Sequence, residues 1–320
     1  MATAIRAADY EGAGLSQVSD HNLNLIIAET CRHSVLSHLV NPNYTIERLG
    51  LDKAPRAVYD IITDISVGGF TGGNWNGDVL EPNNPFKSGE ITMCQTLAIE
   101  KKFSRREAHR LSDRWSTVQG GYEQSIGQAL SALVEDYGLR SIISQANRNN
   151  VGVKAGKKTH SINLGSVEAP LQVGGAGGIK PSKVLKRMRR ALIENVGNCG
   201  SVKVVMTPSL YDMLTDEQSV LPNGSQMSDN PLITGITSPM LGMEILASNS
   251  MPTYERANNG KRIEYVLMVN PDYVAAPMDL PYLEWQTIKH DIFLVGDFAF
   301  DVVALTGNSI VVAAVVVDDE

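Results

Sequence analysis

The sequence has 320 residues, of which 43% are hydrophobic and 20% are charged. This composition excludes a wholly disordered or fibrous chain, and the length predicts one large domain or two linked domains. The longest aliphatic run, residues 310–317, is far shorter than the ~20 residues of a membrane span, so no transmembrane helix is expected. The 28 basic and 35 acidic residues give a net charge of −7, which does not favour general binding of nucleic acid.

The N-terminal residues and the cysteines indicate the cellular compartment in which the chain folds. The first six residues lack the apolar stretch of a secretory signal. Cys31, Cys94 and Cys199 are odd in number and far apart, so neither a disulfide framework nor a CxxC metal site is expected. The chain therefore suits a reducing compartment.

Residues 1–19 are small, polar and aperiodic, and they predict an N-terminal arm. Asp20 is a suitable N-cap for a helix from about residue 21 to residue 40, in which apolar residues follow helical spacing. The helix should end at Asn41, because a residue that precedes proline avoids the helical region.

The segment from residue 54 to residue 110 predicts a long β-hairpin. Residues 59–67 and 91–103 are strand-like, and the stretch between them is rich in glycine and too poor in apolar residues to form a core of its own. Its tip is expected to project from the body and to act between subunits, while a disordered surface loop is the alternative. The candidate contact residues are Phe70, Trp75, Phe86 and Lys87.

The next segment predicts one helix from about residue 113 to residue 145. At 1.5 Å per residue it would be roughly 50 Å long and would lie along the body. Gly120, Gly121 and Gly127 weaken it locally, to admit close packing or a bend. Its apolar stripe steps by three or four residues through Trp115, Val118, Tyr122, Ile126, Leu130, Leu133 and Tyr137.

Residues 147–178 are polar and glycine-rich and form the best candidate for a domain boundary, with one short strand at 161–164. A helix should follow from Pro181 to Gly197, with Lys180 at its cap. A short helix is predicted at 209–214, and a turn at 258–260. The strands predicted beyond this boundary are 202–206, 243–247, 263–269, 292–295, 298–305 and 309–317, the last two pairing as a terminal hairpin.

The glycine run Gly174–Gly178 precedes a helix, as a phosphate-binding loop would. Lys180 stands where the Rossmann spacing needs glycine, and no strand is predicted before the run, so a hinge is favoured. The six histidines are scattered, and no metal-binding or nucleophile motif is complete. We therefore expect no catalytic residue, no metal and no cofactor, and a protein that is not an enzyme.

The clearest charged feature of the sequence is a basic helix. Six cations occur between residues 180 and 190 without an acid among them. A solvated helix face and a patch that meets phosphate or an acidic partner are both compatible with this pattern. The residues that share the basic face, opposite Leu185, Met188 and Leu192, are Lys183, Lys186, Arg187 and Arg190.

Three stretches carry a family resemblance. They are residues 99–111, which run into the long helix, residues 202–214, which give a strand and the following helix, and residues 241–252, which read Leu-Gly-Met-Glu-Ile-Leu-Ala-Ser-Asn-Ser-Met-Pro. With the order of the elements, they make the chain resemble the major capsid proteins of tailed bacteriophages, which have the Hong Kong 97-type fold.

The resemblance implies an α+β fold of the Hong Kong 97-like capsid type. Its parts would be an N-terminal arm, an extended β-hairpin loop, a long spine helix, a peripheral domain and an axial domain. The implied boundaries are 1–55 for the arm and first helix, 56–111 for the extended loop, 112–178 for the spine helix and peripheral domain, 179–284 for the axial domain, and 285–320 for the return strands of the peripheral domain.

The implied function is that of a shell protein. Copies would assemble as pentamers and hexamers into an icosahedral shell that encloses double-stranded DNA, in a virion capsid made in the cytoplasm of a bacterial host. The partners would be the protein itself, a separate scaffolding protein, a portal protein and a decoration protein, with no membrane. A separate scaffolding protein, or none, is expected because the first core-like helix begins near residue 21.

Two other interpretations remain open. An encapsulin-type bacterial compartment has the same fold and would enclose a cargo enzyme in place of DNA. A soluble nucleotide-binding enzyme that uses Gly174–Gly178 belongs to a different class, and a ligand-dependent thermal shift would reveal it.

Overall fold

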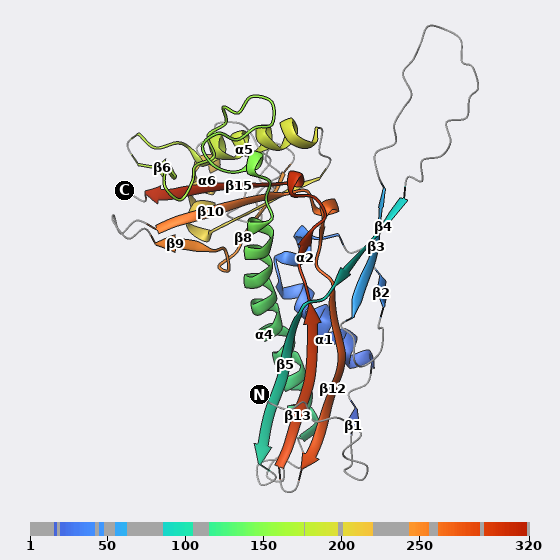
Figure 1. The fold of residues 1–320 in the computed structure, drawn as a ribbon. Helices are drawn as coiled ribbons and strands as arrows, with labels where there is room; N and C mark the ends of the chain where they lie inside the picture. Colours follow the sequence, from blue (N-terminus) through green and yellow to red (C-terminus); the bar gives the residue numbers. More distant parts are fainter. Residues whose placement is uncertain are drawn as a thin grey trace, which may run out of the picture.

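The structure, a computed structural model, describes residues 16–17, 20–41, 45–47, 55–62, 86–104, 115–175, 177–197, 201–219, 243–255, 262–288 and 291–318. Within these residues the chain forms four sheets, and none of its helices is long and apolar enough to cross a membrane. A rounded part and an elongated part make up the molecule, and the long helix α4 (Trp115–Ser144) runs from one into the other (Figure 1). The chain is therefore a mixed α and β protein.

The rounded part is built on a six-stranded sheet. In order across the sheet its strands are β6 (Leu171–Gly174), β15 (Ile310–Asp318), β10 (Arg262–Val269), β7 (Val202–Met206) and β8 (Met243–Ala247), and β9 (Thr253–Glu255) pairs with the far end of β10. The pairs β6–β15 and β7–β8 are parallel, and the other pairs are antiparallel.

Both faces of this sheet are covered, which explains its nearly continuous apolar strands. Every residue of β15 from Ile310 to Val316 is buried. Helices α5 (Pro181–Val196) and α6 (Pro208–Ser219) cover one face, where Val204 belongs to their core. The neighbouring Val205 faces the other way, into the core that surrounds α4. The sheet therefore separates two hydrophobic cores.

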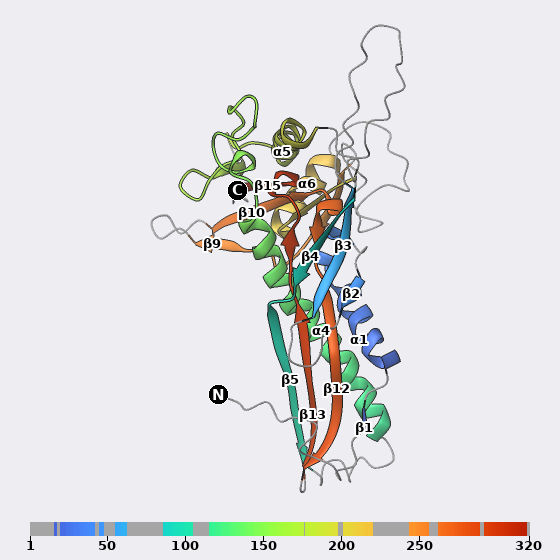
Figure 2. The ribbon, with the colours of Figure 1, turned by 45° about the vertical axis from the view of Figure 1, so that its right-hand side comes forward.

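The elongated part pairs a sheet with α4. Its four antiparallel strands are, in order, β1 (Ser16–Gln17), β12 (Met278–Ile288), β13 (Asp291–Phe300) and β5 (Gln95–Ser104). Helix α4, with α1 (Asp20–His33), lies along this sheet (Figures 1 and 2). Phe103 packs edge-on against Tyr122 of α4, with 4.7 Å between ring centroids, and lies 5.7 Å from the Trp285 ring. Aromatic contacts thus fix the sheet against the helix.

A third sheet rises beside these parts as a ribbon. It consists of β2 (Thr45–Glu47), β3 (Arg56–Ile62) and β4 (Phe86–Thr92), which pair in that order and antiparallel (Figure 1). The last described pair of the ribbon is Ile62 with Phe86, so the tip of the predicted hairpin lies outside the described residues.

Short elements complete the connections. A small pair joins β11 (Val274–Ala275) to β14 (Val303–Ala304). The remaining short helices are α2 (Leu36–Leu39), η3 (Arg148–Asn150), η5 (Pro271–Tyr273) and η6 (Gly307–Ser309).

Two strand pairings differ from the sequence predictions. The predicted strand 91–103 is wrong as one strand, because the chain leaves the ribbon after Thr92 and the remainder, as β5, joins β13 over ten residues. The predicted terminal hairpin is also wrong, because β13 and β15 lie in different sheets. Strand β13 ends at Phe300, and the next residue, Asp301, accepts a hydrogen bond from the Val302 amide at 2.7 Å.

Several other predicted elements agree more closely with the structure. The strands at 202–206 and 243–247 are confirmed at both ends, and the strand at 263–269 is confirmed apart from one added residue. At 161–164 the structure has only an isolated bridge between Ala155 and Ile162. The helix predicted at 209–214 extends from Pro208 to Ser219, and the turn at 258–260 lies outside the described residues.

The long helix is confirmed, with one error among the stripe residues whose burial the structure describes. Leu130 and Val134 are buried, whereas Leu133 is 55% exposed. Gly127 does allow close packing, since a Cβ there would lie 3.2 Å from the Ile26 carbonyl oxygen. Gly120 and Gly121 have no atom within 4 Å of such a Cβ, so they have no packing role against the described residues.

The predicted helix 21–40 breaks at Ser34 and Val35 because a buried carboxylate intervenes. Oε2 of Glu135, on α4, accepts a hydrogen bond from the Val35 amide at 2.8 Å. Its Oε1 accepts a hydrogen bond from the Ser248 hydroxyl, just after β8. Glu135 therefore connects α4 to the junction of α1 and α2 and to the six-stranded sheet.

We predict opposite effects of alanine at two glycines of α4. At Gly138 the new methyl would lie 2.6 Å from Cδ2 of Leu36, which is fully buried and has no room to move. Overpacking costs about 1–3 kcal/mol, more than the ~1 kcal/mol that alanine gains over glycine in a helix. Gly138→Ala should therefore lower the melting temperature.

Gly120→Ala is the matched control. Its site is exposed and open, so the helix propensity gain of up to ~1 kcal/mol should raise the melting temperature. Shifts of the same sign in the two variants would contradict the close contact between Gly138 and Leu36.

Candidate functional site

The site to which the sequence points is the outer side of α5. Lys180 is extended at the N-cap, Pro181 opens the helix, and Gly197 ends it at a φ of 87°, a left-handed conformation that favours glycine. The helix predicted from Pro181 to Gly197 is thus confirmed. Its inner side packs on the sheet through Val184, Leu185, Met188, Ala191 and Leu192.

The four predicted cations do not all face solvent. Lys183, Lys186 and Arg190 are exposed. Arg187 is half-buried, and its Nη1 donates to the Asn163 carbonyl oxygen at 3.3 Å. Arg187 therefore ties α5 to the loop that precedes β6, and three of the four cations remain at the surface.

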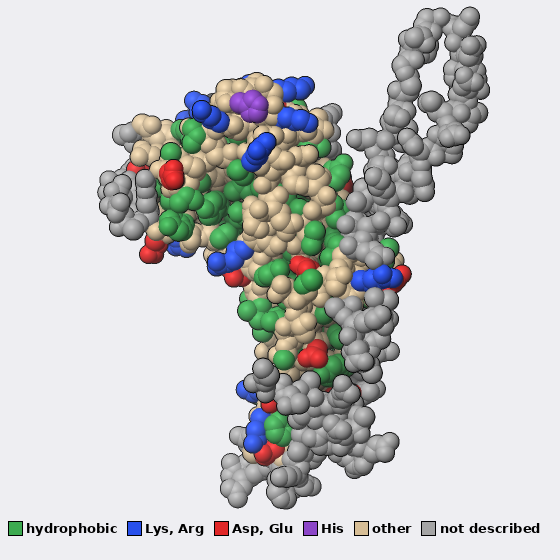
Figure 3. Space-filling view, viewed as in Figure 1, with side chains coloured by type: hydrophobic (Ala, Val, Ile, Leu, Met, Phe, Trp, Pro, Cys, Tyr) green, Lys and Arg blue, Asp and Glu red, His purple; other side chains and the backbone are tan. Residues whose placement is uncertain are grey.

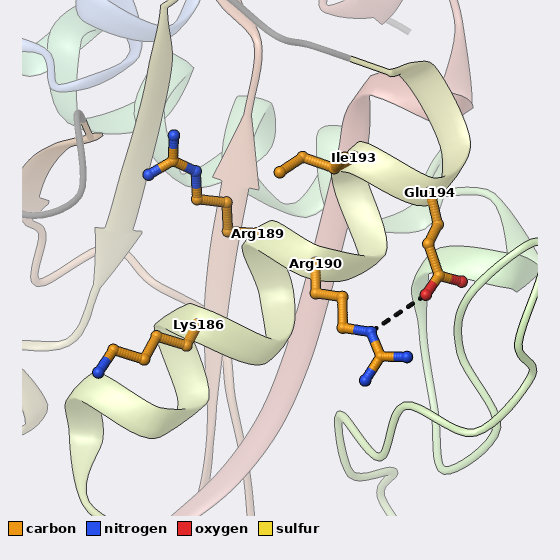
Figure 4. Close-up of a pocket in the computed structure, with 5 residues that line it drawn as sticks. All are labelled: Lys186, Arg189, Arg190, Ile193 and Glu194. Atoms are coloured by element: carbon orange, nitrogen blue, oxygen red, sulfur yellow. Dashed lines mark hydrogen bonds and ion pairs between the residues drawn. The ribbon is translucent and has the colours of Figure 1, made fainter.

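An open groove of ≈ 500 Å³ lies along the exposed side of α5 (Figure 4). Its lining adds three residues that the sequence analysis did not name, Arg189, Ile193 and Glu194. Ile193 is 46% exposed and follows Arg189 and Lys186 at helical spacings of four and seven, so a helical projection would have placed it on the polar face. An exposed apolar side chain thus lies among cations. The lining residues are Lys186, Arg189, Arg190, Ile193 and Glu194.

Glu194 fastens the C-terminal turns of α5 to the preceding loop. Its carboxylate accepts hydrogen bonds from the Thr159 hydroxyl at 3.0 Å and the Thr159 amide at 3.2 Å, and it pairs with Nε of Arg190 at 3.2 Å. Burial alone would raise the pKa of Glu194, but the hydrogen bonds from Thr159, Arg190 and the Lys158 backbone outweigh it and lower the pKa. The ion pair also neutralises part of the charge of Arg190.

Lys and Arg side chains gather at the top of the rounded part, over α5 and the loop before β6 (Figure 3). The exposed cations of that loop include Lys154, Lys157 and Lys158. This end of the molecule is therefore positive although the whole chain is acidic.

The glycine run forms a closed turn. A strand does precede it, contrary to the sequence prediction, because β6 ends at Gly174. The amides of Gly174 and Ile179 donate to the Ile179 and Gln172 carbonyls at 3.3 and 2.8 Å, so they are not directed at a ligand. A Cβ at Gly178 would lie 1.7 Å from the Gly174 carbonyl oxygen, which explains the glycine there.

The N-terminus of α5 already holds an anion. The Glu217 carboxylate of α6 accepts hydrogen bonds from the Ser182 amide at 3.0 Å and from the Ser182 hydroxyl at 2.6 Å. The position where a helix would bind phosphate is thus filled by a carboxylate of the same chain.

Of the four residues predicted to contact other subunits, the structure describes only two. Phe70 and Trp75 lie outside the described residues. Phe86 and Lys87 open β4, where their backbone pairs with Ile62 and Ile61. Among the described residues, no group of three or more His, Cys, Asp or Glu side chains is arranged to hold a metal ion.

We predict a pH-dependent effect of Glu194→Gln. The pKa of Glu194 is lower in the folded chain than its ordinary 4.5, so the carboxylate stabilises the fold when ionised. That contribution is complete at neutral pH and is lost as the pH falls from about 4.5 through the lower folded-state pKa. The variant should therefore melt below wild type at pH 7, and the difference should shrink at pH 3.

Glu168→Gln, at an exposed position of the same loop region, should show no such pattern. A difference for Glu194→Gln that is the same at both pH values would contradict the role of the ionised carboxylate.

Comparison with known proteins gives the fold. No protein family model matches the sequence, and no curated protein matches it. The capsid of Ralstonia phage GP4 matches with a TM-score of 0.52 and 10% identity over 83% of this chain and 84% of that chain. The capsid of cyanophage P-SCSP1u matches with a TM-score of 0.51 and 13% identity over 90% and 89%.

A third match is the procapsid of satellite phage P4 with its size determination protein, at a TM-score of 0.52 and 9% identity over 98% of this chain and 96% of that chain. The predicted resemblance is thus confirmed at the level of fold, and this chain shares its fold with the subunits of phage capsid shells.

Proposed function

We propose that the chain is the major capsid protein of a tailed bacteriophage, which assembles as pentamers and hexamers into an icosahedral shell around double-stranded DNA. The observation that carries the proposal is the extent of the fold match, which spans 83–98% of this chain in three phage shells. A fold alone does not define a function, so the assembled particle is the decisive observation.

The same fold supports a division of the chain into parts. We propose that 1–55 form the arm and first helix, 56–111 the extended loop, 112–178 the spine helix and peripheral domain, and 179–284 the axial domain. Residues 285–320 would then return to the peripheral domain, with two changes. Strands β6 and β15 pair in the six-stranded sheet, so their residues belong with the axial domain, and β12 begins at Met278 in the elongated sheet, so its residues belong with the peripheral domain.

The partners and the location follow from the same proposal. The chain would contact further copies of itself, a separate scaffolding protein, a portal protein and a decoration protein, with DNA inside. It would be located in the virion capsid after assembly in the cytoplasm of a bacterial host.

The proposed role requires no catalysis. The nucleotide-binding alternative loses support, because the amides of Gly174 and Gly178 donate to carbonyls of the chain and Glu217 fills the helix N-terminus. The encapsulin-type alternative differs in cargo and is decided by what the particles contain.

Electron microscopy of the expressed protein tests the proposal. The chain should form closed shells when it is produced in a bacterial host with any scaffolding partner supplied. A folded chain that stays monomeric under these conditions would overturn the proposal, and shells that enclose an enzyme in place of nucleic acid would favour the encapsulin-type compartment.

We further predict that the segment between β3 and β4 acts between subunits, including Phe70 and Trp75. Because Ile62 pairs with Phe86, a two-residue Asn-Gly turn can join the strands directly in place of residues 63–85. The shortened chain should keep a cooperative melt and its circular dichroism, while particles fail to form.

Wild type expressed in parallel is the reference for both measurements. Normal particles from the shortened chain, or loss of the cooperative melt in the isolated subunit, would contradict the assignment of this segment to subunit contacts.

A further inference from the structure

Two neighbouring helices of the rounded part carry opposite charge. Helix α5 has five cations and a single acid, Glu194, which is paired with Arg190. Helix α6 has three acids and no Lys or Arg. Glu217 is bound to the N-terminus of α5, and the side chains of Asp212 and Asp216, one helical turn apart, are exposed.

The two helices lie side by side on one face of the sheet, where Glu217 of α6 binds the N-terminus of α5. Helix α5 packs on β15 and α6 packs on β8, and Met213 of α6 also reaches Gly174 at the end of β6. Lys183 and Lys186 project from the outer side of α5, opposite its buried side chains. The rounded part therefore presents a basic face on α5 and an acidic face on α6.

We propose that the basic face of α5, formed by Lys183, Lys186 and Arg190, packs in the assembly against the acidic face of α6, formed by Asp212 and Asp216, of a neighbouring copy. The inference rests on the proposed function, since it assigns the surfaces through which shell subunits meet.

A contact between two different faces is head-to-tail. Repeated with a fixed rotation, such a contact closes a ring, whereas a contact of one face with itself stops at a dimer. The exposed Ile193 beside the cations supplies the apolar contact that an interface core needs, and the charges around it orient the partner.

A second copy fits the groove better than nucleic acid does. Arg190 is paired with Glu194 and Arg187 is bonded to a carbonyl, so two of the four predicted cations of α5 already meet groups of the same chain. The groove offers Ile193 in place of an aromatic stacking surface. The acidic face of α6, on the same side of the sheet, would repel a phosphate backbone.

Charge reversal tests the pairing. Variant one is Lys183→Glu with Lys186→Glu, variant two is Asp212→Lys with Asp216→Lys, and the third chain combines all four substitutions. Each of the first two places like charges in contact, so the protein concentration needed for assembly should rise at least about tenfold. The combined chain restores opposite charges and should assemble close to wild type.

Two further measurements control the result. Lys154→Glu and Glu168→Lys reverse exposed charges on the same part of the molecule and should assemble as wild type does. Melting curves of every variant establish that the fold is kept. Assembly of wild type should also weaken as salt rises, because screening shortens to about 3 Å at 1 M salt.

Each remaining outcome overturns the inference in its own way. Wild-type assembly by both reversed variants would exclude the contact, and failure of the combined chain to recover would show that the two faces do not meet each other. Normal shells that lose DNA with variant one alone would assign the basic face to nucleic acid. In all three cases wild type still forms shells, so the proposed function stands; a wild-type chain that forms none refutes both.

Discussion

The arrangement of the molecule depends on one buried carboxylate. Glu135 is 7% exposed on α4 and accepts hydrogen bonds from the Val35 amide and the Ser248 hydroxyl. A buried charged group without such bonds would cost several kcal/mol, so the three segments are held where they satisfy it. The Ser248 amide in turn donates to the Met206 carbonyl at 3.0 Å, which extends the connection from α4 into the six-stranded sheet. One side chain thereby fixes the rounded part, the N-terminal helices and the long helix to one another.

The local elements were predictable because each carries its own signal. Helix α4 has apolar residues at helical spacing, α5 has proline at its start and glycine at its end, and β7 and β8 are short apolar runs. Strand β12 was missed because polar residues interrupt its pattern: Glu284 and Gln286 are buried there, and the register shifts between Asp279 and Tyr282, around Pro281. Pairing was less predictable still, since β5 and β13 meet across nearly 200 residues and nothing local specifies that partner.

In the candidate site, too, local features could be predicted from the sequence, whereas tertiary contacts could not. Helical spacing alone placed Lys183, Lys186 and Arg190 on the outer side of α5, and the same projection would have added Ile193. Arg187 donates a hydrogen bond to the Asn163 carbonyl, and Glu194 accepts one from Thr159. Both bonds depend on a loop that folds back onto the helix. Such contacts arise from tertiary packing, so a sequence pattern gives the charge of the surface but not the part of it that remains available.

Opposite charge on α5 and α6 would also make the net charge of the chain compatible with the proposed assembly. A chain of net charge −7 repels its copies at long range, which keeps separate subunits soluble. Individual surface ion pairs contribute only about 0–1 kcal/mol, so the pairing of these faces would orient subunits without making the contact irreversible. Closure of the proposed ring would add up these weak contacts, because each subunit would use its basic and its acidic face at once. In the proposed shell, weak pairwise attraction with ring closure would let misplaced subunits dissociate before the shell is complete, and this is the physical advantage of opposite charge on α5 and α6.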